Sequence, residues 1–284
     1  MSWLWEAISS GFTEPTKDWH IQAVRIMFGL ACLAKFVHGA TGGGWQRFRN
    51  DDISSYLFAR RYGTRFLPWM RHVYRPALVA RIIAAALLAA GVHPRLFAAL
   101  TVLGLLYEML FIPRSLTFFM ACMGTALAFA GNLGGPFHLD DSTSTANTWT
   151  QAIVMILAVD LYINTSWLKI RSPQFRSGQA ISQWLTSARQ IQGKLPAWNY
   201  HYPQRIVSIM ATEDGNPTPI ARAAAWGTIA LEFLIPIGLL IEATRPVSIA
   251  VGIGMHVAFA GLLPRHLAAY SLCSTGAYFA FLNG

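Results

Sequence analysis

Charged residues are scarce in this chain of 284 residues. They make up 12% of the sequence, against a hydrophobic share of 54%, and the mean hydropathy is +0.39. A soluble domain usually carries about a quarter charged residues. The deficit excludes an ordinary soluble domain and favours an all-α, polytopic bundle in the membrane, because a bilayer leaves backbone groups no partner outside their own helix.

Cysteine is also rare. Cys32, Cys122 and Cys273 lie far apart inside apolar runs, and no CxxC pair occurs. Such thiols are typically small buried residues. Their spacing argues against a disulfide framework and against a metal site, so we expect no metal.

Acidic residues are fewer than basic ones, 13 against 22, which gives a formal charge of +9. The basic residues sit in the links between apolar runs, as in Arg47–Arg75 and Lys169–Arg222. This pattern indicates membrane topology and contact with anionic lipids rather than nucleic-acid binding. It predicts that these two links are cytoplasmic and that both termini lie outside. The first twenty residues are interrupted by charges and proline, and they do not read as a signal peptide.

Eight apolar runs are predicted to cross the membrane as helices. They are Ile21–Ala40, Ala77–Ala90, Leu96–Ile112, Leu116–Leu133, Thr148–Trp167, Ile220–Ile241, Ser248–Leu263 and His266–Leu282. Trp3–Phe12 and the basic, aromatic segment Trp45–Pro76 are predicted to be helices at the membrane surface. Gln179–Gln192 is a further predicted helix in a long link. We therefore expect one domain, 1–284, in a multi-pass protein of the cell membrane.

Several polar side chains fall inside or at the ends of these runs: Glu108, Asp160, Asn164, Lys169, Arg171, Glu232 and His256. Burying an ionisable group without a partner costs several kcal/mol, so each is either paired or functional. Glu108 is expected to pair with Arg81. Asp160 has Arg25 or Lys35 as candidate partners.

Lys169, Glu232 and His256 allow two interpretations. Lys169 follows Trp167 at the end of a span, where a lysine can extend to the interface or act as a base in a polar pocket. Glu232 lies four residues before Pro236, and His256 lies in the next antiparallel run at a comparable depth. The two side chains can form a buried hydrogen bond between helices or share a proton in catalysis.

The order of these segments resembles a known family. The carrying residues are Val24-Arg25-Ile26, Leu168-Lys169-Ile170, Phe175-Arg176-Ser177-Gly178, Leu231–Pro236 and Met255-His256-Val257. From about Ala23 to Leu282 the chain is similar to the HTTM family, bacterial membrane proteins related to the vitamin K-dependent γ-glutamyl carboxylase.

The resemblance implies a quinone-dependent enzyme. Lys169 would be the general base that deprotonates a reduced quinone of the vitamin K or menaquinone type, with Glu232 and His256 as supporting catalytic groups. Asn132, Asn164 and Arg171 are the candidate cofactor-binding residues.

Two features depart from the carboxylase. Asn132 is followed by leucine where the carboxylase has histidine, and the last predicted span ends close to Gly284. A small or peptidic substrate is therefore expected rather than a large protein.

Two other functions remain open. One is an accessory role beside a partner protein in the maturation or export of a peptide toxin, and the other is transport of a small molecule. The enzyme requires Lys169, Glu232 and His256 to meet in one pocket, whereas a transporter requires two access routes and an accessory protein an exposed partner surface.

Overall fold

The protein is described by a computed structural model that places residues 16–17, 19–41, 43–48, 52–135, 145–146, 148–191, 204–212, 214–262 and 264–282. The predicted helix Trp3–Phe12 lies outside these residues. Contacts divide the chain into two compact units. Unit 1 is Met1–Leu157 with Leu272–Gly284, and unit 2 is Ala158–Ser271. Each unit is described by itself.

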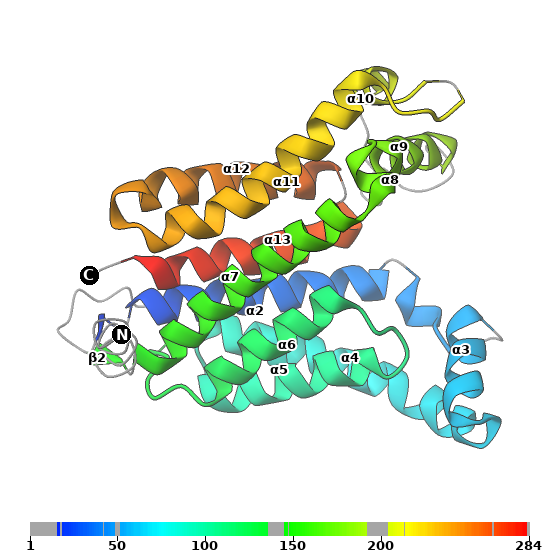
Figure 1. Cartoon of the computed structure of the whole chain (residues 1–284). Helices are drawn as coiled ribbons and strands as arrows, with labels where there is room; N and C mark the ends of the chain where they lie inside the picture. Colours follow the sequence, from blue (N-terminus) through cyan, green and yellow to red (C-terminus); the bar gives the residue numbers. More distant parts are fainter. Residues whose placement is uncertain are drawn as a thin grey trace. The chain divides into compact units, whose positions relative to one another are not determined.

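Unit 1 is a group of helices with one short strand pair. Its elements are β1 (Thr16–Lys17), α2 (Trp19–Thr41), η1 (Gly44–Gln46), α3 (Ile53–Tyr62), η2 (Thr64–Phe66), α4 (Leu67–Ala90), α5 (Pro94–Met109), α6 (Ser115–Ala128), β2 (Thr145–Ala146) and η4 (Tyr278–Phe281). Helices α7 (Thr148–Arg171) and α13 (Pro264–Ala277) each have residues in both units. Strands β1 and β2 pair antiparallel, with Thr16 opposite Ala146. Figure 1 shows α2, α4, α5 and α6 running alongside one another.

Five helical segments among the described residues are long and apolar enough to span a membrane. They are Trp19–Thr41, Thr64–Ala90, Trp149–Arg171, Pro219–Leu240 and Glu242–Gly261. The eight predicted spans are therefore too many by this criterion. Each of the other three does form a helix, but α5 has 16 residues and α6 and α13 have 14 each. At 1.5 Å per residue they measure only about 21–24 Å, short of a hydrocarbon core of about 30 Å.

The expected boundary at Pro76 is wrong. The sequence predicted a surface helix ending there and a short span after it, but α4 continues through Pro76 without interruption for 24 residues. Proline removes one helical hydrogen bond, and packing on both sides of it offsets this cost. Tyr74 before Pro76 and Leu78 after it are both about 2% exposed, and both pack in one aromatic cluster.

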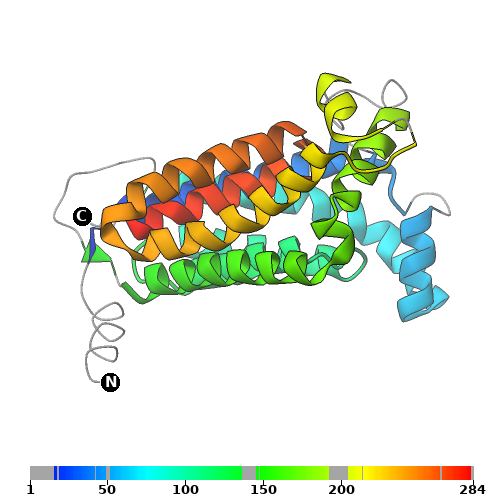
Figure 2. The ribbon, with the colours of Figure 1, turned by 45° about the horizontal axis from the view of Figure 1, so that its top comes forward.

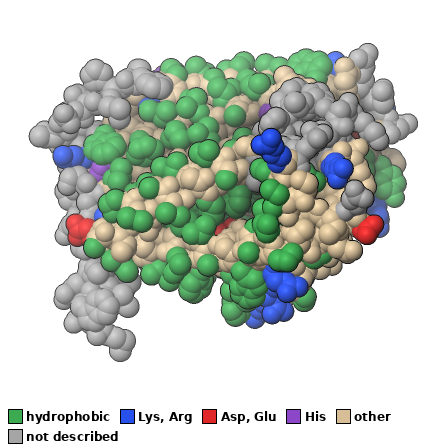
Figure 3. All heavy atoms as spheres, turned by 90° about the horizontal axis from the view of Figure 1, so that it is seen from above, with side chains coloured by type: hydrophobic (Ala, Val, Ile, Leu, Met, Phe, Trp, Pro, Cys, Tyr) green, Lys and Arg blue, Asp and Glu red, His purple; other side chains and the backbone are tan. Residues whose placement is uncertain are grey.

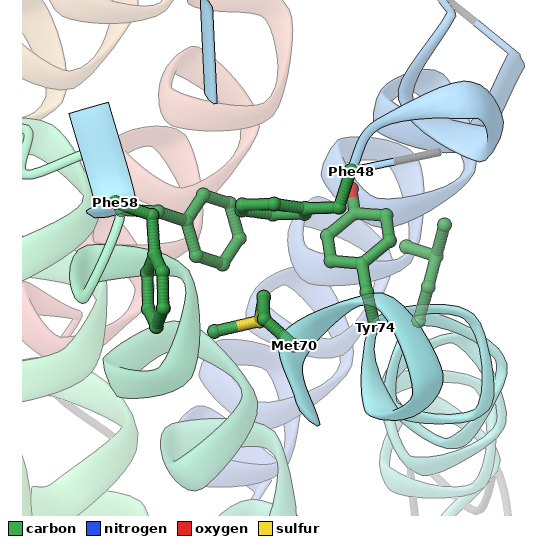
Figure 4. Close-up of a cluster of buried hydrophobic side chains, with 6 residues drawn as sticks. Phe48, Phe58, Met70 and Tyr74 are labelled. Carbon is green, nitrogen blue, oxygen red and sulfur yellow. The ribbon is translucent and has the colours of Figure 1, made fainter. Parts of the chain in front are cut away.

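That cluster holds α3 against the first half of α4. It consists of Phe48, Phe58, Met70, Tyr74, Leu78 and Phe111. Figure 4 shows the side chains of Phe48, Tyr74 and Met70 close together, with the two rings tilted against each other. Their ring centroids are 5.2 Å apart, and those of Phe48 and Phe111 are 5.3 Å apart with nearly perpendicular planes. Edge-to-face pairs of this kind add about 0.5–1.5 kcal/mol beyond the buried area.

Small residues set how closely the unit 1 helices approach. A Cβ atom at Gly29 of α2 would lie 2.7 Å from the backbone nitrogen of Ala89 in α4. A Cβ atom at Gly104 of α5 would lie 2.5 Å from Cγ of Arg81. Close backbone approach through small residues is typical of helices that pack in a membrane.

Unit 2 contains the later helices. Its remaining elements are α8 (Pro173–Arg176), α9 (Gln179–Ile191), α10 (Gln204–Met210), α11 (Pro219–Leu240), η3 (Glu242–Thr244) and α12 (Arg245–Leu262). Figures 1 and 2 both show α11 and α12 side by side, joined by the short turn at η3. Hydrophobic side chains predominate on the face of Figure 3, and the charged ones lie mostly near its edges. The predicted helix Gln179–Gln192 corresponds to α9.

Candidate functional site

An ion pair between α7 and α11 is the centre of the candidate site. The ammonium group of Lys169 contacts Oε1 of Glu232, and the Lys169 and Glu232 side chains are 25% and 6% exposed. Lys169 therefore does not simply extend toward the membrane interface. Two of the three side chains that the sequence predicted to converge do meet.

The two helices are also joined one turn earlier. The hydroxyl of Ser166 donates to the backbone carbonyl of Ile229 at 3.1 Å. Pro236 lies inside α11 and has no N–H, so the carbonyl of Glu232 has no helical donor at the i+4 position. One backbone hydrogen bond of α11 is therefore missing at Glu232, although the helix itself continues to Leu240.

One carboxylate oxygen of Glu232 has unused bonding capacity. Its Oε2 atom is buried and has no hydrogen-bond partner within the described residues. An unsatisfied buried acceptor of this kind usually costs about 1–3 kcal/mol or more. The atom is therefore a place where a ligand that donates a hydrogen bond would bind favourably.

An aromatic ring is a second neighbour of the lysine. The Nζ atom of Lys169 is 5.4 Å from the centroid of the Phe175 ring in α8. Gly178, with φ of +82°, brings this segment close to α11, where a Cβ atom would lie 2.8 Å from the backbone nitrogen of Arg222. The motif Phe175–Gly178 thus places a ring over the ammonium group. A cation and a ring at this distance attract each other by about 0.5–2 kcal/mol.

His256 makes a different contact from the one expected. Its Nε2 atom is hydrogen-bonded to the hydroxyl of Tyr162, two turns before Lys169 on α7. The ring of Tyr270 lies 5.7 Å from the imidazole. Both His256 and Tyr162 are about 2% exposed. His256 thus binds the same helix as the ion pair, but its hydrogen bond joins α12 to α7 through a tyrosine that the sequence did not single out.

The three predicted cofactor-binding residues do not join the ion pair. Asn164 and Arg171 are exposed on α7, and the Arg171 guanidinium stacks 4.4 Å from the Trp167 ring. Asn132 belongs to unit 1, where its Oδ1 accepts from the backbone N–H of Gly134. It lines an open pocket of about 430 Å³ together with His93 and neighbouring residues.

A second charged cluster lies inside unit 1. Nζ of Lys35 is 2.8 Å from Oε1 of Glu108, and Nη1 of Arg81 is 3.6 Å from Oε2 of the same carboxylate. The predicted pairing of Glu108 with Arg81 is therefore confirmed. Lys35, one candidate partner of Asp160, pairs with Glu108 instead, and Asp160 is exposed. The other candidate, Arg25, donates to the carbonyl of Gly135 at 3.2 Å.

This cluster has the character of a structural core. The Arg81 guanidinium lies within 6 Å of three rings, those of Phe36, Tyr74 and Tyr107. The rings and Glu108 enclose the cation and leave the Arg81 side chain 5% exposed. Such packing locks α2, α4 and α5 together.

Sequence reasoning missed Tyr162, Ser166 and the role of Phe175. Tyr162 and Ser166 recur on one face of α7 with Lys169, at i, i+4 and i+7, which is the signal that could have identified them. Among the described residues, no group of three or more His, Cys, Asp or Glu is placed to hold a metal ion. Cys32 and Cys273 are buried free thiols.

The arrangement supports proton sharing. Among the side chains described in contact with the Lys169 ammonium, the Glu232 carboxylate can accept its proton, whereas the Phe175 ring cannot. Comparisons of the chain with protein-family models, with curated proteins and with solved structures found no match.

Proposed function

We propose that the chain is a multi-pass integral membrane protein in which the Lys169–Glu232 pair is the proton-transfer site of an enzyme. The observation that carries this proposal is the buried, unpartnered Oε2 atom of Glu232 beside a partly exposed ammonium group. Ionisable residues inside membrane helices are rare and usually mark sites of binding or proton transfer. The five apolar helices support the membrane location.

A reduced quinone is the substrate class that suits these groups. Its hydroxyl groups are hydrogen-bond donors, and Glu232 Oε2 is an acceptor without a donor. The ring of Phe175 beside Lys169 offers an apolar surface for a flat aromatic molecule. When bound, a quinol would supply the redox chemistry toward oxygen that the protein's own side chains lack.

Lys169 and Glu232 would take up the hydroxyl proton of the quinol. Lys169 becomes a base only after its ammonium has released a proton, and Oε1 of Glu232 is the acceptor in contact with it. Once the Glu232 carboxylate has taken that proton, the neutral amine of Lys169 can receive the hydroxyl proton of the quinol. The resulting positive charge of the pair would be balanced by the quinol anion. Tyr162 and His256 would fix the position of α7 so that Lys169 stays against Glu232.

In this proposal the chain acts as an HTTM-like, quinone-dependent enzyme on a small or peptidic substrate. The competing proposals are an accessory role in peptide-toxin maturation and a transport function. Both differ from the enzymatic proposal in that neither needs Lys169 to give up its proton.

Substitutions at Lys169 test the proposal. Lys169→Arg keeps a cation for Glu232, but arginine does not release its proton in proteins. We expect Lys169→Arg and Lys169→Ala to lower the oxygen-dependent oxidation of a reduced naphthoquinone about a hundredfold or more, since a positioned base contributes at least that much. The measurement is the absorbance change of the quinol in reconstituted nanodiscs.

A matched control is Arg222→Gln, which removes an exposed cation near the start of α11. This variant should oxidise quinol at the wild-type rate. Full activity of both Lys169 variants would contradict the enzymatic proposal and favour the accessory or transport role.

A further inference from the structure

Helix α3 carries an exposed stripe on the side opposite its core contacts. Ile53, Tyr56 and Leu57 are 75%, 63% and 45% exposed, and Arg60 and Arg61 follow them, also exposed. These five positions are i, i+3, i+4, i+7 and i+8, so they lie on one helical face. The stripe is apolar in the first half of the helix and cationic in the second.

The inner side of the same helix is fixed. Phe58 is buried in the aromatic cluster with Phe48, and Figure 1 shows α3 beside the start of α4. The Asp52 carboxylate caps α3 by accepting from the backbone N–H groups of Ser55 and Phe48. Because α3 already has a packed face, its outward stripe is a second surface that the described residues of unit 1 leave uncovered.

The length of the neighbouring helix places this stripe near a membrane boundary. The helical segment Thr64–Ala90 has 27 residues, or about 40 Å at 1.5 Å per residue. A hydrocarbon core is only about 30 Å thick, so about two turns extend beyond it. The first turns carry Arg65 and the half-exposed Trp69, a residue type enriched at membrane interfaces.

The charged side chains of the stripe, together with Arg65, are all cationic. In the described part of the chain, no carboxylate forms an ion pair with the guanidinium groups of Arg60, Arg61 or Arg65. Arg61 and Arg65 instead stack on the rings of Tyr62 and Phe66, at 5.4 and 4.7 Å. A stacked guanidinium keeps its N–H edge for phosphate oxygens.

We propose that the outward stripe of α3, with Arg65, is a docking surface for anionic phospholipids of the bilayer interface. Ile53, Tyr56 and Leu57 dip among the upper acyl carbons, and the three arginines bind the phosphate groups. The surface would select anionic over zwitterionic lipid and anchor this end of unit 1. The inference rests on the proposed membrane insertion of the chain.

The test measures lipid selectivity of the full-length protein. Purified protein is placed in nanodiscs with equal amounts of phosphatidylglycerol and phosphatidylcholine, and lipids retained after transfer to detergent are counted by native mass spectrometry. Wild type should retain phosphatidylglycerol preferentially. Each arginine removed should weaken this preference about fivefold, so Arg60→Gln/Arg61→Gln should weaken it about twenty-fivefold.

The matched control is Arg95→Gln/Arg114→Gln, which removes two exposed arginines outside the links Arg47–Arg75 and Lys169–Arg222. The control should keep the selectivity, and so should Arg60→Lys/Arg61→Lys, which also shows that the fold tolerates changes at these positions. The proposal is overturned by a wild type without preference, by equal loss in the control, or by tight binding of an acidic peptide to the same arginines in discs of phosphatidylcholine alone.

Membrane insertion is measured separately by extraction with alkaline carbonate. Release of the protein from membranes would contradict the proposed function. Retention in membranes without lipid selectivity would overturn the docking surface alone.

Discussion

The two partners of the Lys169–Glu232 pair should respond unequally to substitution. Lys169→Met leaves the Glu232 carboxylate, 6% exposed, without a counter-charge. Removing one partner of a buried ion pair costs about 3–5 kcal/mol. Since Lys169 is a quarter exposed and the site is partly open to solvent, we expect the low end, about 3 kcal/mol.

Glu232→Gln should cost less, about 1 kcal/mol. Glutamine keeps an oxygen that accepts from Nζ, and the partly exposed Lys169 side chain can turn its ammonium group toward solvent. The double variant Lys169→Met/Glu232→Gln removes both charges and should also lose only about 1 kcal/mol, because a neutral pair needs no counter-charge.

Thermal unfolding in detergent, followed by circular dichroism, measures these differences. A chain of this size shifts its midpoint by about 2–4 °C per kcal/mol, so Lys169→Met should lower it by about 6–12 °C and the double variant by about 2–4 °C. A Glu232→Gln variant less stable than Lys169→Met, or a double variant with the summed loss of both, would refute the reasoning.

Two further predictions concern unit 1. Gly29→Ala should lower the unfolding midpoint by several degrees, because the new Cβ would lie 2.7 Å from the Ala89 backbone, whereas Gly227→Ala, with open space around it, should be neutral or stabilising. Glu108→Gln should destabilise the protein by about 3 kcal/mol, because it leaves the cations of Lys35 and Arg81 without a counter-charge. Lys35→Met should cost less, since the Arg81 guanidinium still neutralises the Glu108 carboxylate. A larger loss in Lys35→Met, or equal effects of the two glycine substitutions, would contradict the described packing.

Hydrophobic runs predicted the helices well, but not all of their lengths. Apolar composition located α2, α7, α11 and α12 to within a few residues. It failed at Pro76, because local rules end a helix near proline, whereas the aromatic cluster that carries the helix onward is assembled from Phe48 and Phe111, far away in sequence. Tertiary packing of this kind cannot be read from a local pattern.

The candidate site was predicted in part from the sequence. The cost of burying charge made Lys169 and Glu232 candidates, and the enzyme hypothesis required both to meet with His256 in one pocket. The ion pair between Lys169 and Glu232 was not itself predicted. The hydrogen bond between Tyr162 and His256 was not foreseen, because a tyrosine inside an apolar run looks like an ordinary core residue. Which unit each polar residue joins, as for Asn132, depends on the fold as a whole.

Binding of a quinol to the Lys169–Glu232 pair tests the central claim most directly. The measurement is equilibrium binding of a reduced naphthoquinone, without oxygen, to nanodiscs that hold wild type or Glu232→Gln. In Glu232→Gln the amide oxygen accepts from Lys169, and an NH2 group, which is a donor, takes the place of Oε2. The quinol hydroxyl therefore loses its acceptor. We predict saturable binding to wild type that is at least tenfold weaker in Glu232→Gln and unchanged in Arg222→Gln. Equal binding to all three proteins would contradict the assignment of this pair as the substrate site.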